Sequence, residues 1–190
     1  YTCWHVISYN NDGTVESKQT FQGKNDDSSW ARGQAWAIYG YTACFRETND
    51  SIFLNFAKDI ANMIMDRVKT EDAIPYWDYD APVTKETPRD VSAASVTASA
   101  MIELSTMVPD GQKYLDYAEK ILKSLSSDAY LAKVGDNQGF ILMHSVGSLP
   151  NGSEIDTPLN YADYYYLEAL KRFMELKKLK VENGELRVIQ

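Results

Sequence analysis

The residues best suited to ligand chemistry stand together in the stretch 26–36, which contains Trp30, Arg32, Gln34 and Trp36. Arginine presents a planar fork of N–H donors that matches a carboxylate, and an indole ring offers a flat face for stacking. A helix N-terminus adds a positive field. The stretch therefore predicts a site for an anionic ligand with a flat ring. The alternative is that both tryptophans are core residues and Arg32 is an ion-pair partner, since aromatic residues at helical spacing are more often buried than functional.

A helix must begin within this stretch to present these side chains. Ser28 and Ser29 precede the helical pattern, and serine is a favoured N-cap residue because its hydroxyl accepts a hydrogen bond from a first-turn N–H group. The pattern predicts a helix that begins near Ser28 or Ser29 and runs to about Arg46. Asp26 and Asp27 are interpreted as further capping residues rather than catalytic ones.

The other elements follow from hydrophobic periodicity and turn residues. Residues 1–18 alternate apolar and polar side chains around a turn at 10–13, which is typical of a β-hairpin. Apolar residues at helical spacing predict four more helices, over 51–68, 91–107, 112–126 and 159–178. Three prolines exclude a continuous helix between residues 69 and 90, and Asp90 is placed to cap the helix that follows.

The helices poor in charge begin near Ser29, Asp90 and Pro158, at intervals of 61 and 68 residues. Recurrence at similar spacing indicates a repeat, here a long loop, an inward helix and an outward amphipathic helix. Such helical hairpins bury both faces only by stacking. The chain is therefore expected to be all-α, with short β-hairpins in its loops, and to form part of an α/α toroid whose long loops gather at one mouth.

Composition narrows the possible partners. A chain of 190 residues that is 44% hydrophobic is expected to form a single domain, residues 1–190. Its net charge of −8 argues against nucleic acid or an anionic membrane surface as a partner. No apolar run is long enough to span a bilayer, and no leader pattern is present. Cys3 and Cys44 do not form a metal-ligand pattern, so neither a metal nor a cofactor is expected.

Three segments resemble the unsaturated glucuronyl hydrolases, glycoside hydrolase family 88: Gln22-Gly23 with 26–36, then 90–94, then 154–170. They occur in the family's order, so the resemblance extends over nearly all of the chain up to about Arg172. The related unsaturated rhamnogalacturonyl hydrolases carry a similar motif, with Asn-Gly where this chain has Gln34-Ala35. That difference favours the glucuronyl group.

The resemblance implies an (α/α)6 barrel of six hairpins, of which this chain would supply about the last three, as the C-terminal portion. The implied activity is hydrolysis of oligosaccharides that carry a 4,5-unsaturated glucuronic acid at the non-reducing end. An aspartate protonates C4 and water adds at C5, so one carboxyl group suffices, unlike the two of ordinary glycosidases. That aspartate is expected upstream of Tyr1. A half barrel would expose apolar helix sides, so a complementing N-terminal chain or a homodimer is expected.

The resemblance also implies a set of residues that bind the uronate oligosaccharide: His5, Gln22, Trp30, Arg32, Trp36, Ser145 and Ser148. Arg32 would form a fork to the uronate carboxylate, the tryptophans would stack on sugar faces, and His5 and Gln22 would form hydrogen bonds near the attacking water. Ser145 and Ser148 match a Ser-x-x-Ser element that contacts the next sugar or its sulfate in some relatives. Those relatives carry a lysine at the position of Pro150, so a preference for sulfated substrates is not expected.

Two other interpretations stay open. The chain could be a catalytically inactive half barrel that binds carbohydrate, or an enzyme of the rhamnogalacturonyl type. His5 could be structural rather than a donor to substrate. Asp78 and Asp80 are interpreted as solvated or turn-forming residues rather than as a carboxylate pair that touches substrate. The compartment is left open between the cytoplasm and the periplasm of a bacterium.

Overall fold

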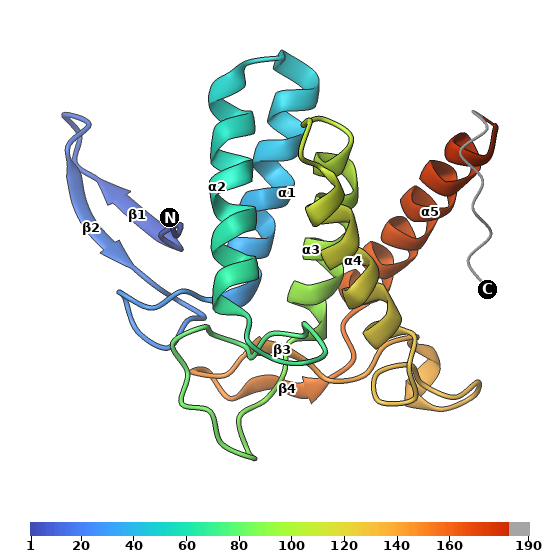
Figure 1. Cartoon of the computed structure of the whole chain (residues 1–190). Coiled ribbons are helices and arrows are strands. Elements are labelled where there is room, and N and C mark those ends of the chain that lie inside the picture. The colour runs from blue at the N-terminus through green and yellow to red at the C-terminus, as the bar shows by residue number, and fades with distance from the viewer. Residues whose placement is uncertain (183–190) are drawn as a thin grey trace.

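A computed structural model describes residues 1–182 of the chain (Figure 1). Its strands form two antiparallel hairpins, β1 (Val6–Tyr9) with β2 (Val15–Gln19) and β3 (Ser145–Ser148) with β4 (Ser153–Thr157). Its α-helices are α1 (Ala31–Thr48), α2 (Ser51–Arg67), α3 (Val91–Ser105), α4 (Gln112–Leu125) and α5 (Asn160–Glu182), with a single 3-10 turn, Asn137–Gly139. The predicted N-terminal hairpin and the five predicted helices are confirmed.

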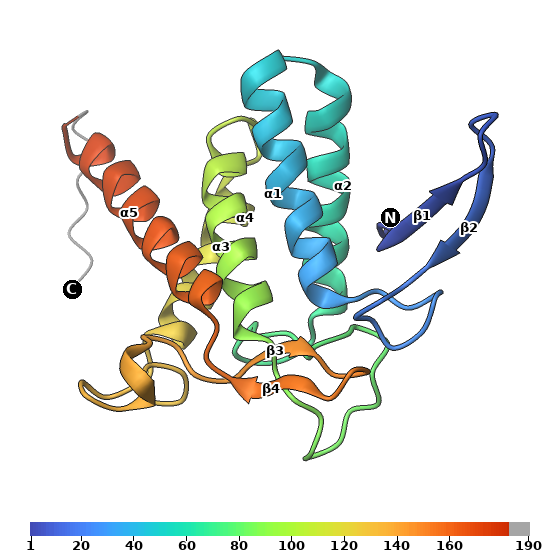
Figure 2. The ribbon, with the colours of Figure 1, turned by 180° about the vertical axis from the view of Figure 1, so that it is seen from behind.

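The helices form two layers. Helices α1, α3 and α5 lie side by side, and α2 and α4 pack against α1 and α3 respectively, in front of them in Figure 1 and behind them in Figure 2. Each of the inner helices α1, α3 and α5 begins at the same end of the molecule, where the segment 69–90 and the β3–β4 hairpin also lie. Residues 1–182 thus contain two complete helical hairpins and the first helix of a third, as the repeat predicted.

The main core lies between the inner and outer layers. It joins Ile38 of α1, Ile64 of α2, Met101 of α3 and Ile121 of α4, all of which are almost fully buried. Helix α3 is buried along most of its length because small residues such as Ala94 and Ala98 allow its neighbours to approach closely.

The start of α1 differs from the prediction. The helix begins at Ala31 with Trp30 at the N-cap, and no side chain caps it. Ser28 and Ser29 are not caps because their hydroxyl groups serve tertiary contacts: Ser28 Oγ donates to Asp78 Oδ2 (2.7 Å), and Ser29 Oγ accepts from Arg67 Nη1 (2.9 Å). Helix α3 follows the prediction, since Asp90 Oδ1 accepts from the N–H of Ser92 (3.1 Å).

Of the two interpretations of Asp78 and Asp80, solvated or turn-forming, the turn-forming one is confirmed. Asp78 is buried and accepts hydrogen bonds from the backbone N–H groups of Lys24 and Asp80 as well as from Ser28. Asp80 accepts from the N–H of Ser29 (2.9 Å) and pairs with Arg67. The two carboxylates therefore hold the loop before α1 against the segment 69–90.

Within residues 1–182, no helix combines the length and the apolar character needed to cross a bilayer. Cys3 is half-buried, Cys44 is exposed, and both are free thiols. No three potential metal-ligating side chains from His, Cys, Asp or Glu gather anywhere in that part of the chain.

Candidate functional site

A cavity of about 360 Å³ opens between the N-terminal segment and the first turns of α1. Its walls comprise Cys3, Trp4, His5, Thr20, Gln22, Asp26, Ser28, Trp30, Gly33, Gln34 and Trp36. We call it the tryptophan cavity. It unites four of the seven residues that were expected to bind substrate, namely His5, Gln22, Trp30 and Trp36. Arg32, Ser145 and Ser148 lie outside its walls.

His5 lies against the ring of Trp30, with the ring centroids 4.5 Å apart and the planes inclined by 27°. Its Nδ1 accepts hydrogen bonds from the backbone N–H groups of Phe21 (3.2 Å) and Gln22 (3.4 Å). Since Nδ1 is an acceptor, the proton of the neutral imidazole belongs on Nε2. Burial and the nearby charge of Arg32 both lower the pKa of His5. His5 is therefore a neutral Nε2–H donor near pH 7.

The pKa of His5 makes stability depend on pH. Its folded value lies below 6.5, so between the two values the unfolded chain binds a proton that the folded chain does not. Stability is complete above about pH 6.5 and is lost as the pH falls through the folded pKa. Urea unfolding of the wild type and of His5→Gln from pH 7.5 to 4.5 should show this loss as an acid-dependent difference between the two curves. Parallel curves would contradict the assignment.

Trp30 is buried against Trp77 and Val146, and the guanidinium of Arg32 lies 4.5 Å from its ring centroid. Gly33, one turn along α1, permits this position. A Cβ atom at Gly33 would lie 2.9 Å from Cε3 of Trp30, closer than real Cβ contacts allow. The small residue at position 33 therefore fixes where the indole ring stands in the cavity wall.

Gly33→Ala is expected to displace Trp30 and to destabilise the chain by about 1–3 kcal/mol through overpacking. Gly40→Ala is the matched control in the same helix, because its Cβ would meet nothing within 4 Å. That control should stabilise the chain by up to about 1 kcal/mol through helix propensity. Urea unfolding and near-ultraviolet circular dichroism measure both effects, and equal stability of the two variants would contradict the account.

Arg32 is only 3% exposed and forms a buried ion pair with Asp90, which is fully buried (2.9 Å between Nη1 and Oδ2). The same Nη1 donates to Ser92 Oγ (3.3 Å) and to the carbonyl oxygen of Val146, and Nη2 donates to the carbonyl oxygen of Gly147 (2.7 Å). Arg32 thus ties α1 to the start of α3 and to β3. Because Arg32 is buried and lies outside the walls of the tryptophan cavity, the expected fork to a sugar carboxylate would require it to leave this position.

Gln22 contacts the same strand, because its Nε2 donates to the carbonyl oxygen of Gly147 (2.7 Å). This contact fixes the amide group and leaves its Oε1 as the acceptor for a ligand. Ser145 and Ser148 are buried on β3. Ser148 Oγ accepts from Asn151 Nδ2 (2.7 Å), whereas Ser145 Oγ is buried without a partner among the described residues. Both serines are therefore buried residues outside the walls of the tryptophan cavity.

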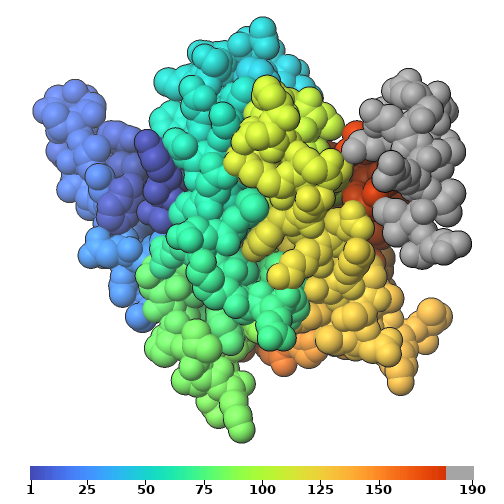
Figure 3. Space-filling model, in the orientation of Figure 1, coloured from blue at the N-terminus to red at the C-terminus, as the bar shows by residue number. Residues whose placement is uncertain are grey.

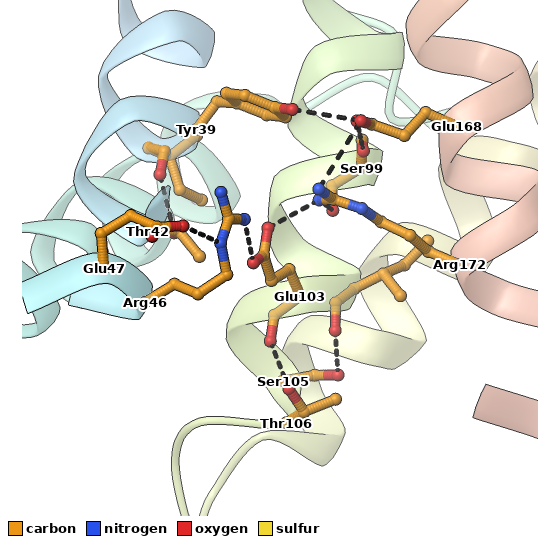
Figure 4. A network of polar contacts seen from close by, with 12 residues as sticks. Tyr39, Thr42, Arg46, Glu47, Ser99, Glu103, Ser105, Thr106, Glu168 and Arg172 are labelled. Carbon is orange, nitrogen blue, oxygen red and sulfur yellow. Dashed lines mark hydrogen bonds and ion pairs between the residues drawn. The ribbon is translucent and has the colours of Figure 1, made fainter. Parts of the chain in front are cut away.

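Trp36 joins the cavity to α5. Its ring meets Tyr165 edge-on (5.1 Å between centroids), and Tyr165 in turn meets Tyr39 edge-on (5.0 Å). Beyond Tyr39 lies a polar network that links all three inner helices (Figure 4). Tyr39 Oη and Ser99 Oγ donate to Glu168, and burial together with Glu168 raises the pKa of Tyr39 to about 12.

The network continues through Arg172. Its guanidinium pairs with Glu103 (2.8 Å), donates to the carbonyl oxygen of Ser99 (3.0 Å) and lies 5.5 Å from the ring centroid of Tyr39 (Figure 4). These contacts fix the spacing of α1, α3 and α5, and therefore support the position of Trp36.

Sequence reasoning grouped Gln34 with the residues suited to ligand chemistry, whereas the structure shows it in a structural contact. Its side chain is 1% exposed and clamps the N-terminal segment onto α1: Oε1 accepts from the N–H of Cys3 (2.8 Å), and Nε2 donates to the Cys3 carbonyl oxygen (3.1 Å). This clamp positions the adjacent Trp4 and His5. The sequence signal for this role was a long polar side chain at a position of the helix that the hydrophobic pattern predicts to face inward.

The fold and the tryptophan cavity together indicate the structural class of the protein. The two layers of helices form part of an (α/α) toroid of the six-hairpin type, with an aromatic cavity at the loop end. The chain superimposes on the crystal structure of an unsaturated glucuronyl hydrolase specific for heparin, with a TM-score of 0.92, 57% sequence identity, and coverage of 94% of this chain and 48% of that one.

Curated relatives agree with the structural match. The chain is 46% identical to an unsaturated glucuronyl hydrolase of Formosa agariphila over 178 residues, which cover 93% of this chain and 44% of the relative. It is 35% identical to an unsaturated chondroitin disaccharide hydrolase of Streptococcus agalactiae over 162 residues, or 81% of this chain and 39% of the relative. A scan against protein-family models finds no match.

Over nearly all of its length the chain is similar to unsaturated glucuronyl hydrolases, and it matches the C-terminal half of these proteins. It spans less than half the length of the curated relatives that it matches.

Proposed function

We propose that this chain forms the substrate-binding part of an unsaturated glucuronyl hydrolase that acts on oligosaccharides derived from glycosaminoglycans. One observation carries the proposal. The tryptophan cavity brings His5, Gln22, Trp30 and Trp36 into one wall from three separate segments of the chain. Aromatic faces beside a few fixed polar groups are the usual construction of a carbohydrate site.

Each side chain has a specific role in this proposal. Trp36 supplies the flat face for the unsaturated ring, and Trp30 forms the back of the cavity. His5 donates its Nε2–H, and Gln22 offers its Oε1, to oxygens near the reacting carbons. Arg32 is a positioning residue rather than a ligand to the carboxylate. It stacks on Trp30, holds β3, and helps to keep His5 neutral.

The reaction needs a proton donor as well as these contacts. A carboxylic acid adds a proton to C4 of the double bond, and water adds its hydroxyl to C5 while its other proton returns to the carboxylate. The resulting hemiketal opens and releases the next sugar. In the cavity wall the one carboxylate is Asp26, whose Oδ1 accepts from the backbone N–H of Thr20 (2.8 Å). We therefore assign the acid to the part of the relatives that this chain does not match.

The test is an incubation of the 190-residue chain with an unsaturated glucuronyl disaccharide, with and without a complementing N-terminal half taken from a relative. Absorbance of the C4–C5 double bond should persist with the chain alone and disappear when both halves are present. Saturable binding without loss of absorbance in either mixture would favour the second candidate, an inactive carbohydrate-binding half barrel. The hydrogen bond that Asp26, the one carboxylate in the cavity wall, accepts from Thr20 is the observation that favours this candidate.

Exposed apolar residues on α5 support the proposal that another chain packs against this helix. Tyr164, Leu167 and Met174 lie at helical spacing and are 60%, 51% and 57% exposed, an apolar stripe of the kind that monomers cover. We propose that the complementing half of the toroid covers it. Leu167→Glu should prevent restoration of activity by the N-terminal half. Analytical ultracentrifugation of the chain alone tests the alternative, because a dimer that Leu167→Glu dissociates would identify a second copy as the occupant.

A further inference from the structure

A second cavity of about 360 Å³ lies on the outer side of the molecule, between the end of α2 and the segment 69–90. Figure 3 shows that segment (green) on the same outer face as α2 (teal). The cavity walls comprise Arg67, Val68, Lys69, Thr70, Pro75, Tyr76, Tyr79, Ala81, Val83 and Arg89. We call it the arginine cavity. It shares no residue with the tryptophan cavity, and its volume falls in the range of roughly 300–1,000 Å³ typical of small-ligand sites.

The charge of the wall is unusual for this chain. The protein carries a net charge of −8, yet the wall holds Arg67, Lys69 and Arg89 and no aspartate or glutamate. The carboxylates that pair with these three cations, Asp80, Asp66 and Asp72, lie outside the wall. The cavity wall therefore presents N–H donors and no carboxylate to a ligand, although each cation is paired with a carboxylate outside the wall.

The two arginines are held in fixed positions. Arg67 donates from Nη1 to Ser29 Oγ (2.9 Å) and pairs through Nη2 with Asp80, and its guanidinium lies 5.6 Å from the ring centroid of Tyr79. Guanidinium carries five N–H donors, so donors remain after these contacts. A fixed guanidinium loses little entropy when it binds an anion.

Arg89 is held in the same way. It donates from Nη1 to Asp72 (3.3 Å) and to the carbonyl oxygen of Ile74, and lies 4.5 Å from the ring centroid of Tyr76. Pro75 and Val83 add apolar surface beside the tyrosines, and Val83 is 72% exposed. The wall thus offers cations for an anionic group and an aromatic and aliphatic surface for a ring.

We propose that the arginine cavity binds a second, non-reacting anionic sugar: a carboxylated or sulfated ring of a glycosaminoglycan-type chain. The carboxylate or sulfate would accept from Arg67, Lys69 and Arg89, and the less polar face of the ring would lie against the tyrosines. The choice of a sugar as the carrier of the anionic group rests on the proposed function. Such a site would hold a longer chain beside the tryptophan cavity.

The probe is a heparin tetrasaccharide without a C4–C5 double bond, titrated into the 190-residue chain by calorimetry at low ionic strength. Lys69→Glu should weaken binding by about tenfold or more, because it reverses a charge in the wall. Lys113→Glu is the matched control, since Lys113 forms the same i,i+3 pair with Asp110 outside the cavity. It should leave binding within about twofold. Val83→Glu should weaken binding as Lys69→Glu does.

Three results would overturn the proposal. The first is the absence of saturable binding of the tetrasaccharide, and the second is equal weakening by Lys69→Glu and Lys113→Glu. The third is binding of inorganic sulfate as tight as that of the tetrasaccharide, which would exclude a role for the sugar ring. Trp36→Ala should leave tetrasaccharide binding unchanged and weaken binding of the unsaturated disaccharide. This contrast separates failure of the arginine cavity from failure of the proposed function.

Discussion

Replacement of Arg32 by methionine is expected to lower the free energy of unfolding by about 3–5 kcal/mol, because removal of one partner leaves the other charge buried and unpaired. The remaining partner is Asp90, which is fully buried. The carbonyl oxygens of Val146 and Gly147 also lose the hydrogen bonds from Arg32, and Gly147 keeps only the one from Gln22 Nε2. Urea denaturation of the 190-residue chain measures the loss.

A comparison with an exposed ion pair makes this result specific. Lys123→Met breaks the surface pair with Glu119, in which the lysine is 76% exposed, and should cost at most about 1 kcal/mol. The double variant Arg32→Met/Asp90→Asn should recover part of the loss, because asparagine removes the buried charge and remains a good N-cap residue. Equal costs for Arg32→Met and Lys123→Met would contradict the structural role of Arg32.

Trp36→Ala is expected to weaken binding of the unsaturated disaccharide by about tenfold or more, since it removes the flat wall on which the sugar ring would stack. Trp36→Phe keeps an aromatic face and should stay within about threefold of the wild type. Isothermal titration gives both constants.

Phe21→Ala is the control for Trp36→Ala. Phe21 is a large aromatic residue, 68% exposed, that lies outside the walls of the tryptophan cavity. Its removal should leave the dissociation constant unchanged. Equal affinity of Trp36→Ala and the wild type for the disaccharide would contradict the proposed stacking of the sugar ring on Trp36.

Most of the helical architecture could be predicted from the sequence because the residues that begin and end helices are local signals. Asp90 directly precedes the helix that it caps, and the prolines at 75, 82 and 88 lie within the loop that they keep from being helical. The start of α1 could not be predicted in this way. Ser28 and Ser29 have the local character of caps, but their partners Asp78 and Arg67 are distant in the chain. The tertiary hydrogen bonds of these two serines therefore replaced the capping contacts that their local sequence favours.

The candidate site shows the same division. His5, Gln22, Trp30 and Trp36 were expected from their residue types and from the resemblance, and the structure gathers them in one cavity. The surroundings of Arg32 depend on Asp90, 58 residues away, and on carbonyl groups of β3, more than 110 residues away. Sequence reasoning proposed both a ligand contact and an ion pair for this residue. Coordinates were needed to identify its partners.

The most direct test of the central claim is the response of the four indole N–H signals in nitrogen-15 NMR spectra as the unsaturated glucuronyl disaccharide is added. Trp36 forms a wall of the tryptophan cavity, whereas Trp77 packs behind Trp30 and lines neither that cavity nor the arginine cavity. The account predicts a saturable shift of the Trp36 signal while the Trp77 signal stays in place. A Trp36 signal that does not move at saturating disaccharide would contradict it.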